Sequence, residues 1–234
     1  MEYKNLPLKD LNNFHDGQLL LVDKPLTWTS FDVVNKIRYH LKGIHKTGKI
    51  KVGHAGTLDP LATGLLIICI GKYTKRIDEV QALEKEYEGS LVLGATRPSF
   101  DKETEINKTF ETGNISINDL SKTSKQFIGK IVQTPPIYSA IKINGERAYK
   151  KARKNEVPDI KSKEVTISNF KLCNIEFPNI GFKITCSKGT YIRSLVNDFG
   201  KELNNGAYLD SLRRNRIGSF HINDAMTLEK LLQR

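Results

Sequence analysis

The order of strand-like and helix-like segments constrains the fold of this chain more than any other feature. Short apolar or alternating runs, typical of strands, occur at "GQLLLVDKP" (17–25), "LLIICIG" (65–71), "KEYEGSLVLG" (85–94) and "FKITCSKG" (182–189). These runs do not alternate strictly with helical segments, so a doubly wound parallel sheet is not favoured. We expect the α+β class, with a mixed, mainly antiparallel sheet flanked by helices and loops.

Four helices are expected between and after these strands. "TSFDVVNKIRYHL" (29–41) has the capping-box spacing of Thr29 and Asp32, with an apolar face of Val34, Ile37 and Leu41. "SINDLSKTSKQFIG" (116–129) has Ser116 as N-cap, a stripe of Leu120, Phe127 and Ile128, and a stop at Gly129. The other two are a helix that carries Ile192, Leu195, Phe199 and Leu203 on one face, and the short "TLEKLLQR" at the end. Residues 101–115 are expected to be an exposed loop.

The size and charge of the chain narrow its class. Its 234 residues fit one large domain, expected over residues 1–234, because domains of mixed type often run to about 200–250 residues. The formal net charge is +11, with 37 Lys and Arg against 26 Asp and Glu. Such an excess favours a polyanionic partner such as nucleic acid, although it also serves solubility.

Several functional classes lose their usual signature. Cys69, Cys173 and Cys186 are far apart and odd in number, which indicates buried free thiols and neither a disulfide framework nor a metal site. The sequence also lacks the phosphate-loop, dinucleotide-binding, zinc-hydrolase and nucleophile-elbow motifs. No signal peptide and no apolar run of about 20 residues is present, so we expect a soluble, cytoplasmic protein.

One carboxylate stands out, Asp59 in "GHAGTLDPLATG" (53–64). Small residues before it let a ligand approach the backbone closely, and Pro60 biases Asp59 toward an extended conformation. The apolar run that follows can anchor the loop. Taken alone, the stretch is more typical of an ordinary Asp-Pro turn than of a catalytic loop.

Six segments together settle that ambiguity, because they resemble the motifs of the TruB family of tRNA pseudouridine synthases in the family's order. They are "LLLVDKP" with "TSFDVV", "GHAGTLDPLATGLL", "KEYEGSLVLG", "QTPPIYSAIKINGERAYKKAR", "CSKGTYIRSLVNDFG" and "LRRNRIGSF", spread over residues 19–220. The resemblance implies the pseudouridine synthase fold and the isomerisation of a tRNA uridine by base flipping.

The resemblance also implies roles for individual residues. Asp59 matches the essential aspartate, Tyr87 the tyrosine that stacks on the flipped base, and Arg193 the arginine that pairs with the aspartate. His54 matches the histidine that enters the RNA loop, and Lys24 the lysine behind the active site. The expected substrate-binding set is completed by Tyr191, Asp101, Thr57 and Leu58.

Each of these roles has a plainer alternative. Tyr87 lies on an alternating strand and is also typical of a core residue. Arg193 follows apolar Ile192 and is compatible with a surface helix position. His54 is also typical of a loop histidine bonded to the backbone.

Basic residues around the motifs are expected to hold the phosphates of the T arm of tRNA. They are Lys142, Arg147, Lys150, Lys151, Arg153 and Lys154, then Arg213, Arg214 and Arg216, with the basic loop 42–51 as a further candidate. The chain departs from the family in having Thr27 where Lys-Pro-x-Gly is usual. Because the last motif lies close to Arg234, we expect no separate RNA-binding PUA domain.

The sequence thus predicts a tRNA pseudouridine synthase that acts on uridine 55 in the T stem-loop. We expect it to work as a monomer, without a cofactor, a metal or a membrane. Two alternatives remain open, a tRNA-binding folding chaperone with dispensable catalysis and a synthase acting on another RNA.

Overall fold

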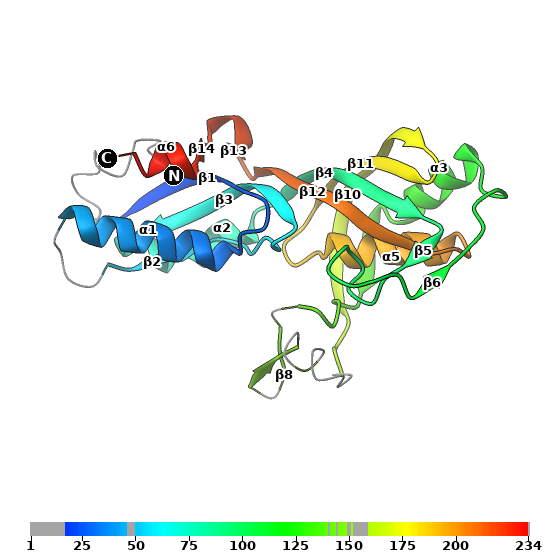
Figure 1. The fold of residues 1–234 in the computed structure, drawn as a ribbon, viewed down its shortest axis with the longest axis horizontal. Helices are drawn as coiled ribbons and strands as arrows, with labels where there is room; N and C mark the ends of the chain where they lie inside the picture. Colours follow the sequence, from blue (N-terminus) through cyan, green and yellow to red (C-terminus); the bar gives the residue numbers. More distant parts are fainter. Residues whose placement is uncertain are drawn as a thin grey trace. The chain divides into compact units, whose positions relative to one another are not determined.

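The structure is a computed structural model that describes residues 17–45, 50–139, 141–143, 145–148, 151 and 159–233. The chain divides into two compact units. Unit 1 comprises Met1–Tyr87 with Leu212–Arg234, and unit 2 comprises Glu88–Ser211 (Figure 1). Two strands, β4 (Lys85–Leu93) and β12 (Ala207–Ile217), each contribute residues to both units.

The sheet of unit 1 is built on β1 (Gln18–Lys24) and β3 (Ala62–Ile70). These two strands pair antiparallel along the whole of β1, with Leu21 opposite Ile67. β12 pairs parallel with β3 through residues 212–214, which gives the strand order β14-β1-β3-β12. The short strands are β2 (Val52–His54) beside β3, β13 (Phe220–His221) beside β12, and β14 (Met226–Thr227) beside β1.

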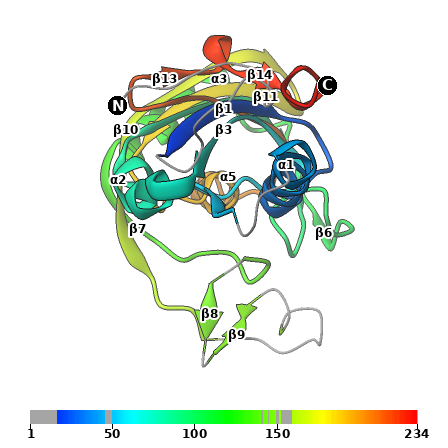
Figure 2. The same cartoon turned by 90° about the vertical axis from the view of Figure 1, so that its left-hand side faces the viewer.

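Both faces of this sheet are covered, which explains why β1 and β3 are apolar along most of their length. Leu20, Val22 and Leu66 pack with residues of α1 (Ser30–His45) and α6 (Leu228–Leu231). Leu19, Leu21 and Leu65, which alternate with them along the strands, pack with residues of the 3-10 helix η2 (Gly71–Arg76) and α2 (Ile77–Ala82). In Figure 2, α1 and α2 are seen on either side of β3.

Unit 2 contains the strand order β12-β4-β11-β10-β7. Its sheet is formed by β11 (Asn179–Cys186), β10 (Lys163–Glu176) and β7 (Gly129–Gln133), which pair antiparallel, together with β4. Helices α3 (Ile117–Gln126) and α5 (Ile192–Glu202) belong to this unit. Unit 2 also contains two short antiparallel ribbons, β5 (Ala95–Thr96) with β6 (Lys108–Thr109) and β8 (Lys142–Ile143) with β9 (Glu146–Arg147). The 3-10 helix η3 (Ile222–Asp224) belongs to unit 1.

An aromatic cluster joins the helices of unit 2 to their sheet. Phe199 of α5 lies 5.4 Å from Phe170 of β10 between ring centroids, and Phe127 at the end of α3 lies 6.3 Å from Phe199. These separations are typical of favourable aromatic pairs. The cluster fixes α5, and with it the functional residues at the start of that helix.

The α+β prediction and its four helices are confirmed. Thr29 caps α1 as expected, since its hydroxyl accepts the Asp32 N–H at 3.0 Å and Asp32 accepts the Thr29 N–H at 2.9 Å. Ser116 and Asp119 form the same capping box on α3.

Two smaller expectations are wrong, and a third holds only in part. Ile128 is 47% exposed instead of buried, because it follows the last turn of α3. The Cys173 thiol is only half-buried. The expected loop 101–115 is mostly exposed, as predicted, but it contains the two-residue strand β6 and the buried Asp101. Among the described residues, no helix is long and apolar enough to cross a membrane, and no cluster of three or more metal-ligating side chains occurs.

Candidate active site

The loop that carries Asp59 connects β2 to β3 and is fixed by the start of α1. The buried Ser30 hydroxyl accepts the Leu58 N–H at 2.8 Å and donates to the Leu58 carbonyl at 3.0 Å. The Pro60 carbonyl accepts the Thr27 N–H at 2.8 Å, and the Ala62 N–H closes the turn onto the Asp59 carbonyl at 3.1 Å. The backbone on both sides of Asp59 is therefore held by bonds from residues outside the loop.

Arg214 of β12 also holds the Asp59 loop. Its side chain is 1% exposed, and it donates to the carbonyls of Leu65 at 2.8 Å, Gly56 at 3.0 Å and Thr57 at 3.5 Å. A single guanidinium thus ties the loop to β3, because its fork of donors reaches several acceptors at once. Gly64 allows β12 to come this close, since a Cβ there would lie 2.4 Å from the Arg214 carbonyl oxygen.

Lys24 lies at the end of β1 with its side chain fully buried. Its ammonium donates to the carbonyls of Trp28 at 2.6 Å and Pro25 at 2.9 Å. Burial lowers the pKa of Lys24 to about 8, while the negative charge of Asp59 acts in the opposite direction. Lys24 is therefore held at the end of β1, near enough to Asp59 for the two charges to interact, and its role in substrate binding stays a prediction.

The other predicted site residues of unit 1 differ in their exposure to solvent. Asp59 is half-buried and Thr57 is exposed, whereas Leu58 is 4% exposed and anchors the loop. His54 is half-buried, and its pKa is lowered mainly by burial and further by the charge of Arg214. The lowered pKa favours the neutral form of the imidazole. Tyr87, on β4, is 8% exposed.

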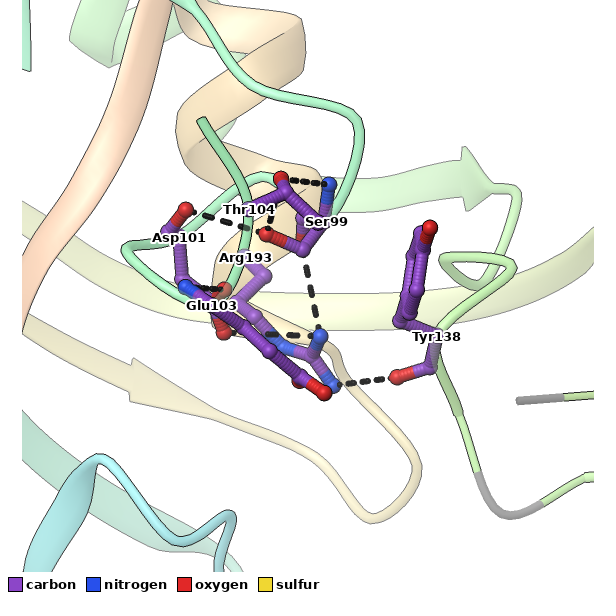
Figure 3. Close-up of polar contacts among 6 residues, drawn as sticks. All are labelled: Ser99, Asp101, Glu103, Thr104, Tyr138 and Arg193. Atoms are coloured by element: carbon purple, nitrogen blue, oxygen red, sulfur yellow. Dashed lines mark hydrogen bonds and ion pairs between the residues drawn. The ribbon is translucent and has the colours of Figure 1, made fainter. Parts of the chain in front are cut away.

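Unit 2 places Arg193 in a second set of contacts (Figure 3). Its guanidinium lies 3.5 Å from the Asp101 carboxylate and donates to the carbonyls of Ser99 at 3.2 Å and Tyr138 at 3.0 Å. Both charged side chains are nearly inaccessible, at 4% and 6% exposed. Asp101 also accepts the Glu103 N–H at 2.9 Å, which orders the turn around it.

The segment that begins at residue 133 is fastened to the start of α5. The Gln133 side chain accepts the Tyr191 N–H at 2.7 Å and donates to the Tyr191 carbonyl at 3.1 Å. The Ser194 hydroxyl donates to the Thr134 carbonyl at 2.8 Å. The Lys163 ammonium lies 4.8 Å from the centroid of the Tyr191 ring, a cation–π contact. These contacts join the start of α5 to the segment that follows β7.

Comparison with known proteins decides the family. The family model described as "TruB family pseudouridylate synthase (N terminal domain)" matches residues 42–192, which is more than half of the chain. The chain belongs to the TruB family of pseudouridylate synthases. The model described as "tRNA pseudouridylate synthase B C-terminal domain" matches residues 193–234.

Relatives over nearly the full length support the TruB assignment. The chain is 53% identical to tRNA pseudouridine synthase B of Flavobacterium johnsoniae over 216 residues, covering 91% of this chain and 93% of that protein. It is 51% identical to tRNA pseudouridine synthase B of Phocaeicola vulgatus, covering 93% and 92%.

The fold has solved counterparts. A chain in the crystal structure of a Cbf5-Nop10-Gar1 complex matches with a TM-score of 0.71 and 26% identity over 99% of this chain. This chain spans 60% of the length of that counterpart.

Within unit 1, the structure brings together Asp59, Thr57, Leu58, His54 and Lys24 around one loop. Within unit 2, it brings together Arg193, Asp101 and Tyr191 near the start of α5. The pairing of Asp59 with Arg193 stays a prediction of the TruB resemblance, as do the catalytic roles of Asp59, Tyr87 and Arg193.

The expected phosphate contacts of the last motif are wrong for Arg214, which is buried under the Asp59 loop. Its neighbours are also engaged: Arg213 forms two bonds with Asp23, at 2.8 and 3.1 Å, and Arg216 bonds Glu84 at 3.1 Å. The prediction failed because the partners of these arginines lie far away in the sequence, and no local pattern in "LRRNRIGSF" indicates them. Of the other basic positions, the side chains of Lys142, Arg147, Lys150, Arg153 and Lys154 lie outside the described residues, as do residues 46–49 of the basic loop.

Sequence reasoning missed Ser30 and Arg214 as supports of the Asp59 loop, and Asp101 as the partner of Arg193. Ser30 had a signal, because it follows the N-cap Thr29 directly in a motif that the TruB family shares. The Arg193–Asp101 pair joins residues far apart in the sequence, and no local pattern marks such a pair.

Proposed function

We propose that this chain is a tRNA pseudouridine synthase that isomerises uridine 55 in the T loop, with Asp59 as the catalytic carboxylate. The observation that carries the proposal is the fixed Asp59 loop. Ser30 and Arg214 hold the backbone before a half-buried carboxylate, and the Thr27 N–H holds the Pro60 carbonyl after it. A rigid loop of this kind supplies the positioning that an enzyme needs at a reacting atom.

The reaction is an isomerisation with a closed balance. The N1–C1′ bond of the uridine breaks, the ring turns, and a C5–C1′ bond forms. The hydrogen on C5 leaves as a proton and N1 gains one, so no redox partner or group donor takes part. An ionised Asp59 acts on the nucleotide as this bond exchange proceeds.

Cations near Asp59 favour its charged form. Lys24 lies close enough for the charge of Asp59 to influence its pKa. Arg193 is proposed as a further catalytic residue, because the TruB resemblance pairs this arginine with the aspartate, and its guanidinium is oriented by Asp101 and two carbonyls.

Two further residues serve base flipping. Removing a base from its stack costs roughly a few kcal/mol, and stacking on an aromatic ring returns about 1–3 kcal/mol. Tyr87 is proposed as that ring and as the group that helps remove the C5 proton. His54, whose lowered pKa favours its neutral form, enters the RNA loop where the uridine has left.

The proposed enzyme acts on tRNA as a monomer in the cytoplasm and uses no cofactor or metal. Release of the C5 hydrogen tests the reaction directly. tRNA transcribed with uridine tritiated at C5 should lose one tritium for each pseudouridine formed, in the presence of a chelator. Binding of the same tRNA without tritium release would contradict the proposed function and favour a folding chaperone.

A further inference from the structure

A basic surface pocket of unit 1 lies next to the strand that leads into the Asp59 loop. Its volume is about 540 Å³. Arg38 and Lys42, four residues apart on α1, share one face of that helix, and Lys51 directly precedes β2. The rest of the described lining is Ile50, Val52, Gly53, Thr74 and Ile77, and it includes no acidic residue.

The walls of this pocket are held by specific contacts. The Arg38 guanidinium donates to the Val52 carbonyl at 2.9 Å and to the Asn35 side chain at 3.1 Å. The Lys51 carbonyl accepts the Gly71 N–H at 2.9 Å, which joins β2 to η2. A Cβ at Gly53 would lie 2.8 Å from the Ile77 side chain, so β2 packs directly against α2. These contacts therefore hold in place the elements that carry the three cations.

The positive charge of the pocket favours the binding of an anion. Three positive side chains around one hollow repel one another, and no carboxylate in the described lining offsets them. Lys42 and Lys51 are exposed and Arg38 is half-buried, so the charges face a region open to solvent. Lys and Arg in such an arrangement are the residues that contact nucleic-acid phosphates.

The position of the pocket indicates which anion. Lys51 precedes His54 by three residues and Asp59 by eight, and β2 passes without interruption into the catalytic loop. We infer that this pocket binds backbone phosphates of the substrate RNA close to the flipped uridine. The inference rests on the proposed function and assigns to Arg38, Lys42 and Lys51 the task of placing the strand that His54 enters.

The test compares two variants of equal charge loss. Lys42→Gln/Lys51→Gln removes the two exposed cations and leaves Arg38, whose bonds support the pocket. Lys122→Gln/Lys125→Gln removes two exposed lysines of α3 and is the matched control. The dissociation constant of a T stem-loop RNA is measured between 50 and 200 mM salt, together with KM and kcat.

The pocket variant should reduce the slope of log Kd against log salt by about 1.4–1.8, since each phosphate contact contributes about 0.7–0.9. Its KM should rise about tenfold, with the loss in KM and not in kcat, while the control keeps the wild-type slope. Equal slopes for the two variants would overturn the inference.

Two further outcomes are distinguishable. Inorganic phosphate could raise the Tm of the wild type but not of the pocket variant, while the slope of log Kd against log salt for RNA stays unchanged. That result would assign the pocket to free phosphate and overturn the RNA inference. A wild-type protein that forms no pseudouridine would contradict the proposed function, whereas the slope comparison on bound RNA would still decide the pocket.

Discussion

At the scale of single residues, the buried Lys24 makes stability depend on pH. Its pKa is lowered to about 8 in the folded protein, from an ordinary value of 10.5. Between these two pH values the unfolded chain holds a proton that the folded chain has lost, so the free energy of unfolding rises with pH. Relative to Lys24→Met, the wild type should gain up to about 3 kcal/mol across this window. Urea denaturation of both proteins at pH 7.5 and 10 measures it, and a constant difference would contradict the assignment.

Arg214 and Arg213 are neighbours with different expected roles. Arg214→Lys loses the fork that reaches three carbonyls under the Asp59 loop, and should cost about 2–3 kcal/mol of stability. Because the loop shifts, kcat should fall about 10–100-fold with little change in KM. Arg213→Lys alters an ion pair whose arginine is 37% exposed, and should cost less than about 1 kcal/mol. Similar losses of kcat in the two variants would contradict the role given to Arg214.

At the scale of elements, the start of α1 does two separable tasks. Thr29 caps the helix, whereas Ser30 holds the catalytic loop through both polar groups of Leu58. Thr29→Ala should lower stability by about 1 kcal/mol and leave kcat unchanged. Ser30→Ala leaves the buried Leu58 N–H without its partner, costs about 1–3 kcal/mol, and should also lower kcat. Thermal unfolding and single-turnover rates separate the two, and an unaffected kcat in Ser30→Ala would count against the loop's role.

Elements were the most predictable level of this structure. The capping boxes of α1 and α3 and the apolar alternation of β4 are local signals, which depend on residues within about four positions. The supports of the site were not predictable in this way. Arg214 bonds Gly56, and Arg193 bonds Asp101, across long stretches of chain. Only the folded chain brings such partners together, so sequence alone indicated these arginines as functional without their contacts.

At the scale of the whole molecule, a net charge of +11 predicts RNA binding that depends strongly on salt. The affinity for a T stem-loop should fall at least about tenfold between 50 and 200 mM salt, which corresponds to about two phosphate contacts or more. Filter binding over this range measures the effect. A flat dependence would mean that the positive charge serves solubility and not recognition.

Mapping the product shows whether Asp59 drives the isomerisation of one uridine in tRNA. An unmodified tRNA transcript is incubated with the wild type, with Asp59→Ala and with the near-isosteric Asp59→Asn, without added metal or cofactor. Pseudouridine is then located at single-nucleotide resolution. We expect product at uridine 55 of the T loop with the wild type, and none with either folded variant. Product at that uridine with Asp59→Ala, or binding without product in the wild type, would contradict it.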